Sequence, residues 1–259
     1  MPLICFASPK GGVGKTMLAA NVAGQLVRAG ARQVIALDLD PQNTLRLHFG
    51  VPLGQRDGMM LRLEQPAEWR NVVVNSRSGV LMMPYGAASF DTVLQHNAKL
   101  AAHPELLTQP LRQLAADPST TVIVDTVPGP SSSLAAVLPA TDMLISVLAA
   151  DAASLALLAD VRSAACYGST TASALDGQRI QHRVVINQFD PLSRLSTSLM
   201  KGVSGVLSQD LLGMVFRDEH VAEALVAQQL VSDYAPYSRA AADLSAATQR
   251  IVSSLKVAR

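Results

Sequence analysis

The chain has 259 residues, of which 49% are hydrophobic and 16% are charged, and this composition excludes an intrinsically disordered protein. Lysine and arginine number 21 against 20 acidic residues, so the net charge of +1 provides neither a broad basic surface for nucleic acid nor an acidic tail. Cys5 and Cys166 lack the spacing of a disulfide framework or a zinc site, so free thiols in a reducing cytosol are expected. We expect neither a secretory signal nor a membrane-spanning helix, and the length suits one domain over residues 1–259.

Short apolar runs alternate with helical patterns along the chain, as is typical of βαβ units around a buried parallel sheet. The helix expected at 15–28 carries Leu18, Val22 and Leu26 on one face and ends at Gly30. Strands are expected at 3–7, 34–37, 121–124, 143–148, 183–186 and 212–216, a short edge pair at 72–74 and 80–83, and further helices at 152–165, 220–228 and 238–256. The pattern predicts an α/β fold: a single domain with a mostly parallel sheet flanked by helices on both faces.

The strongest local signal is a glycine-rich loop between the first expected strand and the helix that follows it. The loop reads Lys10-Gly11-Gly12-Val13-Gly14-Lys15-Thr16 and continues into Met17. Glycines let successive backbone N–H groups turn inward, and the helix dipole favours an anion there. Lys15 can reach the β and γ phosphates of a nucleotide, and the Thr16 hydroxyl can ligate Mg²⁺. A chance glycine-rich turn would rarely combine strand, loop and helix in this order.

Acidic residues follow two of the expected strands. Asp38 and Asp40 follow the strand at 34–37, and Asp125 follows the strand at 121–124. Ligands of open parallel sheets bind outside the carboxyl ends of the strands, so we expect these carboxylates near the glycine-rich loop. An apolar strand that ends in aspartate places a carboxylate near Mg²⁺, usually through water. Taken alone, Asp38 could instead cap a helix.

The loop departs from the standard phosphate-binding pattern, because Pro9 stands where that pattern has its first glycine. With Lys10 directly before the glycine pair, the loop instead resembles that of the ParA/MinD family of P-loop ATPases. The segment 35–42 resembles the family's switch I, and the strand that ends at Asp125 resembles its Walker B strand. The resemblance implies a slow Mg²⁺-dependent ATPase in which Asp40 orients the attacking water, while Asp38 and Asp125 support the metal beside Thr16. It also implies an ATP-bridged homodimer in which Lys10 reaches the partner's nucleotide.

Two later positions resemble the family's base-binding region. Asn187 directly follows the strand at 183–186. In the family, an asparagine amide at this place offers a donor and an acceptor to the purine. Ordinary turn chemistry would also explain an asparagine there. Arg217 lies in a segment that resembles the region packed against adenine. The resemblance therefore implies catalytic roles for Lys10, Lys15 and Asp40, metal binding by Thr16, Asp38 and Asp125, and ATP binding by Gly11, Gly12, Val13, Gly14, Lys15, Thr16, Met17, Asn187 and Arg217.

Segments 43–50, 69–70 and 81–86 resemble the cellulose biosynthesis (BcsQ) branch of the family. This resemblance implies a cytoplasmic ATPase that regulates or localises a bacterial cellulose synthesis and secretion machinery. Its partners would be cellulose synthase accessory proteins, which could recruit it to the inner membrane. The alternative is a partition ATPase that binds nonspecific DNA. That role needs a basic surface, and the basic residues of the second half are too dispersed to predict one: Arg194, Lys201, Arg239, Arg250, Lys256 and Arg259.

Overall fold

The computed structural model describes residues 2–176 and 180–257. Within these residues, eight strands form one sheet in the order β3-β4-β2-β5-β1-β6-β7-β8. Neighbouring strands are parallel except for the antiparallel pair of β3 and β4 at one edge. The strands are β1 (Leu3–Ala7), β2 (Gln33–Asp38), β3 (Val74–Asn75), β4 (Leu81–Met83), β5 (Thr120–Asp125), β6 (Met143–Ala149), β7 (Gln181–Phe189) and β8 (Leu211–Phe216).

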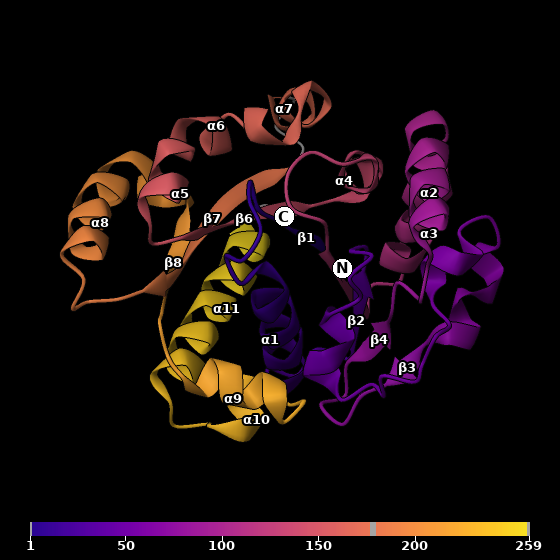
Figure 1. Ribbon diagram of the computed structural model, residues 1–259, viewed down its shortest axis with the longest axis horizontal. Helices are drawn as coiled ribbons and strands as arrows, with labels where there is room; N and C mark the ends of the chain where they lie inside the picture. The colour runs from indigo at the N-terminus through magenta and orange to yellow at the C-terminus, as the bar shows by residue number, and fades with distance from the viewer. Residues whose placement is uncertain (1, 177–179, 258–259) are drawn as a thin grey trace.

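Helices cover both faces of this sheet (Figure 1). One face carries α1 (Lys15–Arg28), α9 (His220–Val226), α10 (Val231–Tyr234) and α11 (Arg239–Val257). The other carries α2 (Phe90–Ala102), α3 (Glu105–Ala116), α4 (Ser132–Val137), α5 (Ala152–Ala156), α6 (Leu158–Arg162), α7 (Ser169–Asp176) and α8 (Arg194–Leu207). Short 3₁₀ turns lie at η1 (Leu45–Phe49), η2 (Met59–Arg62), η3 (Pro66–Val72), η4 (Leu138–Ala140), η5 (Ala165–Tyr167) and η6 (Ser208–Asp210).

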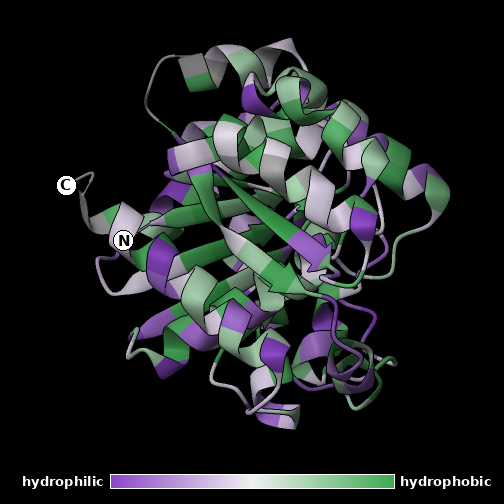
Figure 2. Cartoon of the chain, turned by 90° about the vertical axis from the view of Figure 1, so that its left-hand side faces the viewer, coloured by the Kyte–Doolittle hydropathy of each residue, from purple (hydrophilic) through white to green (hydrophobic). Residues whose placement is uncertain are grey.

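Burial on both faces explains why the central strands are largely apolar. In β1, Ile4 and Phe6 belong to the core beneath α1 and α11, while Leu3 and Cys5 belong to the core on the opposite face. Successive side chains of a strand point to opposite faces, so covering both faces favours apolar residues at successive positions. Figure 2 shows these strands as a green layer between the two helical layers. The predicted fold class is confirmed.

The strand order places a crevice at the carboxyl end of β1. This strand lies between β5 and β6, and the chain leaves it toward β2 on one side and later continues to β6 on the other. Ligands of open parallel sheets bind at such a point of reversal. The loop between β1 and α1 lies there, as predicted.

The prediction of one continuous helix at 152–165 is wrong. The segment forms α5, α6 and η5, because Leu157 leaves helical geometry at ψ 0° and Ala164 has a left-handed φ of 56°. The break lets Leu158 and Val161 pack in the core beneath this end of the sheet. Other predicted bounds agree within a few residues, although β7 extends past Asn187 to Phe189. Both cysteines are free thiols.

Candidate functional site

The loop after β1 has the backbone geometry that its glycines predict. Gly12 and Gly14 have positive φ angles of 76° and 84°, a region that favours glycine. A Cβ on Gly14 would also lie 2.1 Å from the Nδ2 atom of Asn187, so no larger residue fits there without displacing that side chain. Gly14 precedes α1 and has no side chain to cap it, which leaves N–H groups at the helix start available for an anion.

Below the loop, Asp125 joins the two functional side chains at the start of α1. The Lys15 Nζ atom donates to one carboxylate oxygen at 2.5 Å, and the Thr16 hydroxyl donates to the other at 2.7 Å. Lys15 is 5% exposed and Asp125 is fully buried. Burial raises the pKa of Asp125, and the ammonium group of Lys15 opposes that rise. The pair therefore forms a neutralised cluster at the carboxyl end of β5.

The loop after β2 is built around Asp38. Both Asp38 oxygens accept backbone N–H groups, one from Asp40 at 2.9 Å and one from Leu45 at 3.0 Å. The side chain is fully buried, and burial together with the charge of Asp125 raises its pKa. Asp40 lines the cavity beside the loop and accepts the Gln42 N–H at 3.0 Å. The structure thus aims Asp40 at the cavity, whereas Asp38 holds the loop that carries it.

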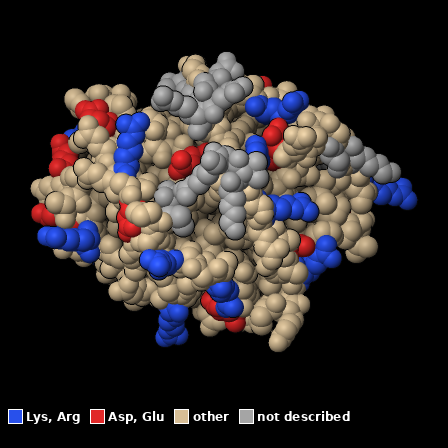
Figure 3. All heavy atoms as spheres, turned by 180° about the vertical axis from the view of Figure 1, so that it is seen from behind, with Lys and Arg blue, Asp and Glu red and all other residues tan. Residues whose placement is uncertain are grey.

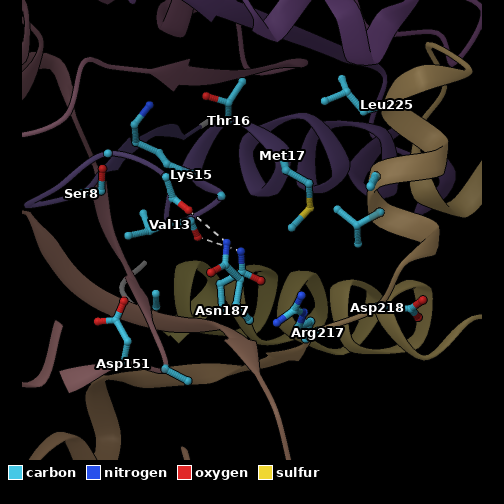
Figure 4. A pocket seen from close by; sticks show the side chains of 18 of the residues that line it. Ser8, Val13, Lys15, Thr16, Met17, Asp151, Asn187, Arg217, Asp218 and Leu225 are labelled. Carbon is cyan, nitrogen blue, oxygen red and sulfur yellow. Dashed lines mark hydrogen bonds between the residues drawn. The ribbon is translucent and has the colours of Figure 1, made fainter. Parts of the chain in front are cut away.

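The cavity has a volume of about 940 Å³, and its lining includes all nine residues predicted to bind ATP as well as Asp40. These lining residues are Gly11, Gly12, Val13, Gly14, Lys15, Thr16, Met17, Asp40, Asn187 and Arg217 (Figure 4). Asp38 and Asp125 lie beneath it as buried groups. The site predicted from separate motifs is therefore one continuous space between the loop, β7, β8 and α9.

Asn187 lies close to the loop as well as to the predicted base-binding end. Its Nδ2 atom donates to the carbonyl of Val13 at 2.8 Å, which leaves the amide oxygen and one further N–H for other partners. Arg217 is exposed at the end of β8, and its backbone N–H donates to the carbonyl of Phe189 at 2.8 Å. The Phe216 ring lies at 5.0 Å from that of Phe189 in an edge-to-face contact. The base-binding end is thus more open than the phosphate end.

Lys10 forms an ion pair within its own chain. Its Nζ atom lies 2.6 Å from an Asp151 carboxylate oxygen, and the two side chains are 30% and 44% exposed. Asp151 also caps α5 by accepting the Ser154 N–H at 2.8 Å. Burial acts to raise the pKa of Asp151, but the hydrogen bonds from Lys10 and Ser154 outweigh it and hold that pKa below its usual value. Lys10 must leave this pair before it can reach a second subunit.

The oxygen donors beneath the loop suit Mg²⁺. The Thr16 hydroxyl and the Asp125 carboxylate are hard ligands already adjacent to each other, and the described residues include no group of three or more His, Cys, Asp or Glu that could hold a metal by itself. Mg²⁺ is commonly bound by one or two protein oxygens together with phosphates and water. Once bound there, it would neutralise charge on the phosphates.

A glycine-rich loop before α1, the buried pair of Lys15 and Asp125 with Thr16 bonded to it, and a strand order that opens at β1 define a P-loop ATPase of the ParA/MinD class. Solved structures of this class share the fold: MinD from Pyrococcus horikoshii has a TM-score of 0.77 at 18% identity over 99% of this chain and 98% of its own. A ParA family ATPase from Chlorobium tepidum has a TM-score of 0.71 at 19% identity, over 96% and 97% of the two chains. The chain belongs to the family described as cellulose biosynthesis protein BcsQ, whose model matches residues 1–252.

Similarity to individual curated proteins divides between two kinds. A virulence plasmid ParA family protein of Chlamydia psittaci is 25% identical over 98% of this chain and 96% of its own length. The BcsQ protein of Escherichia coli is 30% identical, but the match covers only 35% of this chain and 36% of that protein. The identity to the BcsQ protein is thus higher but confined to about a third of the chain, whereas the identity to the plasmid protein is lower but extends over nearly the whole chain.

Sequence reasoning missed two residues that the structure brings to the site. Asp151 carried a signal, because an aspartate immediately before an alanine-rich helical stretch is typical of a helix N-cap. Gln188 carried none, because a glutamine near a strand end is ordinary. Its side chain nevertheless donates to the Gly12 carbonyl at 3.0 Å.

Proposed function

We propose that this protein binds ATP with Mg²⁺ and hydrolyses it slowly. The observation that carries the proposal is the cluster of Lys15, Thr16 and Asp125 beneath a loop with free N–H groups. When ATP enters, the Lys15 ammonium exchanges Asp125 for phosphate oxygens, and Thr16 and Asp125 hold the metal. Asp40, on the cavity wall, orients water toward the terminal phosphate. Asn187, Met17 and Arg217 contact the nucleoside.

Hydrolysis serves as a switch between monomer and dimer in this proposal. Two copies face each other with ATP between them, and each Lys10 contacts the partner's phosphates. Triphosphates that face each other repel unless cations lie between them, which gives Lys10 its role. The half-exposed position of Lys10 supports this, since a lysine at 30% exposure can change partners at small cost. Loss of the terminal phosphate then returns Lys10 to Asp151.

The dimer regulates or localises a bacterial cellulose synthesis and secretion machinery from the cytoplasm. Membership of the BcsQ family and the local similarity to the E. coli protein support this role. Within the described residues, no helix has the length and apolarity needed to cross a bilayer, so any recruitment to the inner membrane is assigned to protein partners. These partners are accessory proteins of the cellulose synthase.

A partition ATPase that binds nonspecific DNA is the second candidate, favoured by the full-length similarity to the plasmid ParA family protein. Such binding needs clustered Lys and Arg against the phosphate backbone. On the face seen in Figure 3, Lys and Arg side chains stand apart, with Asp and Glu among them. The side chains of Lys201 and Lys256 and the whole of Arg259 lie outside the described part of the chain.

Deletion and complementation in the host separate the two candidates. Deletion of the gene is expected to lower cellulose output, wild-type protein to restore it, and Lys15→Ala to fail. Lys99→Ala is the matched control, because Lys99 is an exposed lysine on α2 that pairs with Glu64 and lies outside the cavity lining. Normal cellulose after deletion, together with ATP-dependent and salt-sensitive binding of the purified protein to random DNA, would establish the partition role instead.

A further inference from the structure

Two consecutive amide side chains at the end of β7 contact the phosphate-binding loop. Asn187 donates to the carbonyl of Val13 at 2.8 Å, and Gln188 donates to the carbonyl of Gly12 at 3.0 Å. Figure 4 shows both bonds as dashed lines between β7 and the loop. Neighbouring residues of a regular strand point to opposite faces, so two in succession cannot both reach one loop from a regular strand.

A local departure from strand geometry makes the double contact possible. Gln188 has a φ of 58°, the left-handed region that non-glycine residues rarely adopt. The pairing of β7 with β8 shifts register between Ile186 and Phe189, so the irregularity includes Gln188. Irregular strand positions of this kind often redirect a side chain near a functional site. Here the redirected side chain points to the loop.

The two bonds fix the orientation of two peptide planes. In a planar trans peptide the C=O and N–H groups point in opposite directions. Holding the carbonyls of Gly12 and Val13 toward β7 therefore turns the N–H groups of Val13 and Gly14 away from it. The bonds also occupy carbonyl oxygens that would otherwise repel an incoming phosphate. The loop is thus set for an anion before the nucleotide arrives.

We infer that Gln188, together with Asn187, is a positioning residue that fixes the phosphate-binding loop in its anion-accepting conformation. The inference rests on the proposed nucleotide-binding function, but its structural part concerns the free protein. Asn187 is buried and packs against Gly14, so its replacement would disturb several contacts at once. Gln188 is exposed, and its side chain can be changed with less disturbance.

Three substitutions separate the side-chain bond from the backbone conformation. Gln188→Asn keeps an amide and tolerates a left-handed φ but is one methylene too short. Gln188→Gly relaxes the backbone and removes the bond. Gln188→Glu keeps the length but replaces the donor with a negative charge. Gln95→Asn, at an exposed glutamine of α2, is the matched control.

The readouts are hydrogen exchange of amides 11–15 in the nucleotide-free protein, ADP affinity by calorimetry, and the melting temperature. For Gln188→Asn and Gln188→Gly we expect faster hydrogen exchange at the loop and about threefold to tenfold weaker ADP binding. Gln188→Glu should lose more ADP affinity than either. The melting temperatures should stay near that of the wild type. ADP is used because the proposed dimer requires ATP.

Three results would overturn the inference. Loop exchange and ADP affinity equal to wild type in all three variants would mean that the contact does not position the loop. Losses of melting temperature in proportion to ADP affinity would indicate general destabilisation. A defect confined to ATP-dependent dimerisation would place Gln188 in the subunit interface. If the wild type fails to bind ADP, the proposed function fails, while the exchange measurement still decides whether Gln188 holds the loop.

Discussion

The two ends of the nucleotide cavity differ in how they are built. At the phosphate end, Lys15 and Asp125 are buried and bonded to each other. The loop above them turns at its glycines and accepts hydrogen bonds from two amide side chains of β7. At the opposite end, Arg217 is exposed and the wall is a short helix, α9, with Leu225 at 37% exposure. One end is a preformed cluster of charged side chains, and the other is an open, solvent-exposed surface.

In the proposed function the two ends recognise different parts of the nucleotide, which would account for this difference. A phosphate is small and charged, so it requires several donors at fixed positions, and burial strengthens each of them. A base offers a large apolar surface that a loosely shaped wall can cover. The phosphate end should therefore respond strongly to single substitutions, and the base end only weakly.

The largest effect is expected from Lys15→Ala, which breaks the charge cluster. It removes a charge-assisted phosphate contact and should cost about 2 kcal/mol or more of ATP binding. It also leaves the Asp125 carboxylate buried without its cation, which destabilises the fold by about 3–5 kcal/mol. Calorimetry with ATP and thermal unfolding measure the two losses separately.

A double variant distinguishes the two consequences of that substitution. Lys15→Met with Asp125→Asn replaces both charges by neutral groups of similar size and should recover much of the lost stability. ATP binding should remain absent. ATP affinity near that of wild type in the double variant would refute the role of Lys15 at the phosphates.

Asp40→Asn tests whether the switch I aspartate acts on water rather than on binding. Asparagine keeps an oxygen that can accept the Gln42 N–H, so the loop conformation is retained. The change removes the negative charge that orients water, and hydrolysis should fall about a hundredfold or more while ATP affinity changes little. Phosphate release and calorimetry provide the two measurements. An equal loss of both would mean that Asp40 holds the nucleotide.

Two imidazoles, in η1 and in β7, make stability depend on pH. Burial lowers the pKa of His48 and of His182 to about 4, below the ordinary value of 6.5. The unfolded chain therefore binds more protons than the folded one, so stability is complete above about pH 6.5 and is lost as the pH falls through about 4. Thermal unfolding between pH 7 and 4.5 should show this decline.

His48→Gln identifies one source of the decline. Glutamine is similar in size and does not titrate, so the melting temperature of this variant should fall less between pH 7 and 4.5 than that of the wild type. His103→Gln is the control, because His103 is an exposed residue with 64% side-chain accessibility. Parallel curves for wild type and His48→Gln would exclude His48 as a contributor.

Sequence patterns predicted the phosphate end better than the open end for a physical reason. The loop 10–16 is one continuous segment whose chemistry is fixed by residue type and spacing, and strands such as β5 reveal their burial as an apolar run ending in Asp125. The bond from Gln188 depends on an irregular β7 that no local pattern marks. The breaks between α5 and α6 depend on packing against the sheet, and propensity alone favours one alanine-rich helix. The sequence therefore predicted contacts between residues that strand ends bring together, such as Thr16 and Asp125, and missed those that depend on irregular backbone, such as the bond from Gln188.

Asp38 illustrates the same limit at the phosphate end. The resemblance of residues 35–42 to switch I implied a place for Asp38 near the metal, and that role stays a prediction. Both of its oxygens accept N–H groups of the loop after β2. Burial of a carboxylate with two backbone donors could not be read from the spacing, because Leu45 lies seven residues away in the chain.

The smallest effect is expected from Asp151→Asn, which weakens the hold on Lys10. Asparagine can still cap α5 by accepting the Ser154 N–H, so the fold is preserved. Exposed ion pairs contribute about 0.2–1 kcal/mol, so freeing Lys10 should tighten the ATP-dependent dimer by no more than about fivefold for each of its two Lys10–Asp151 pairs. Dimer formation is measured by light scattering over a protein concentration series, in the Asp40→Ala background so that ATP persists. Lys10→Ala in the same background should weaken the dimer, and ADP affinity should be unchanged by Asp151→Asn. A weaker dimer for Asp151→Asn would instead mean that Asp151 orients Lys10 toward the partner, and the pair would then belong to the interface rather than compete with it.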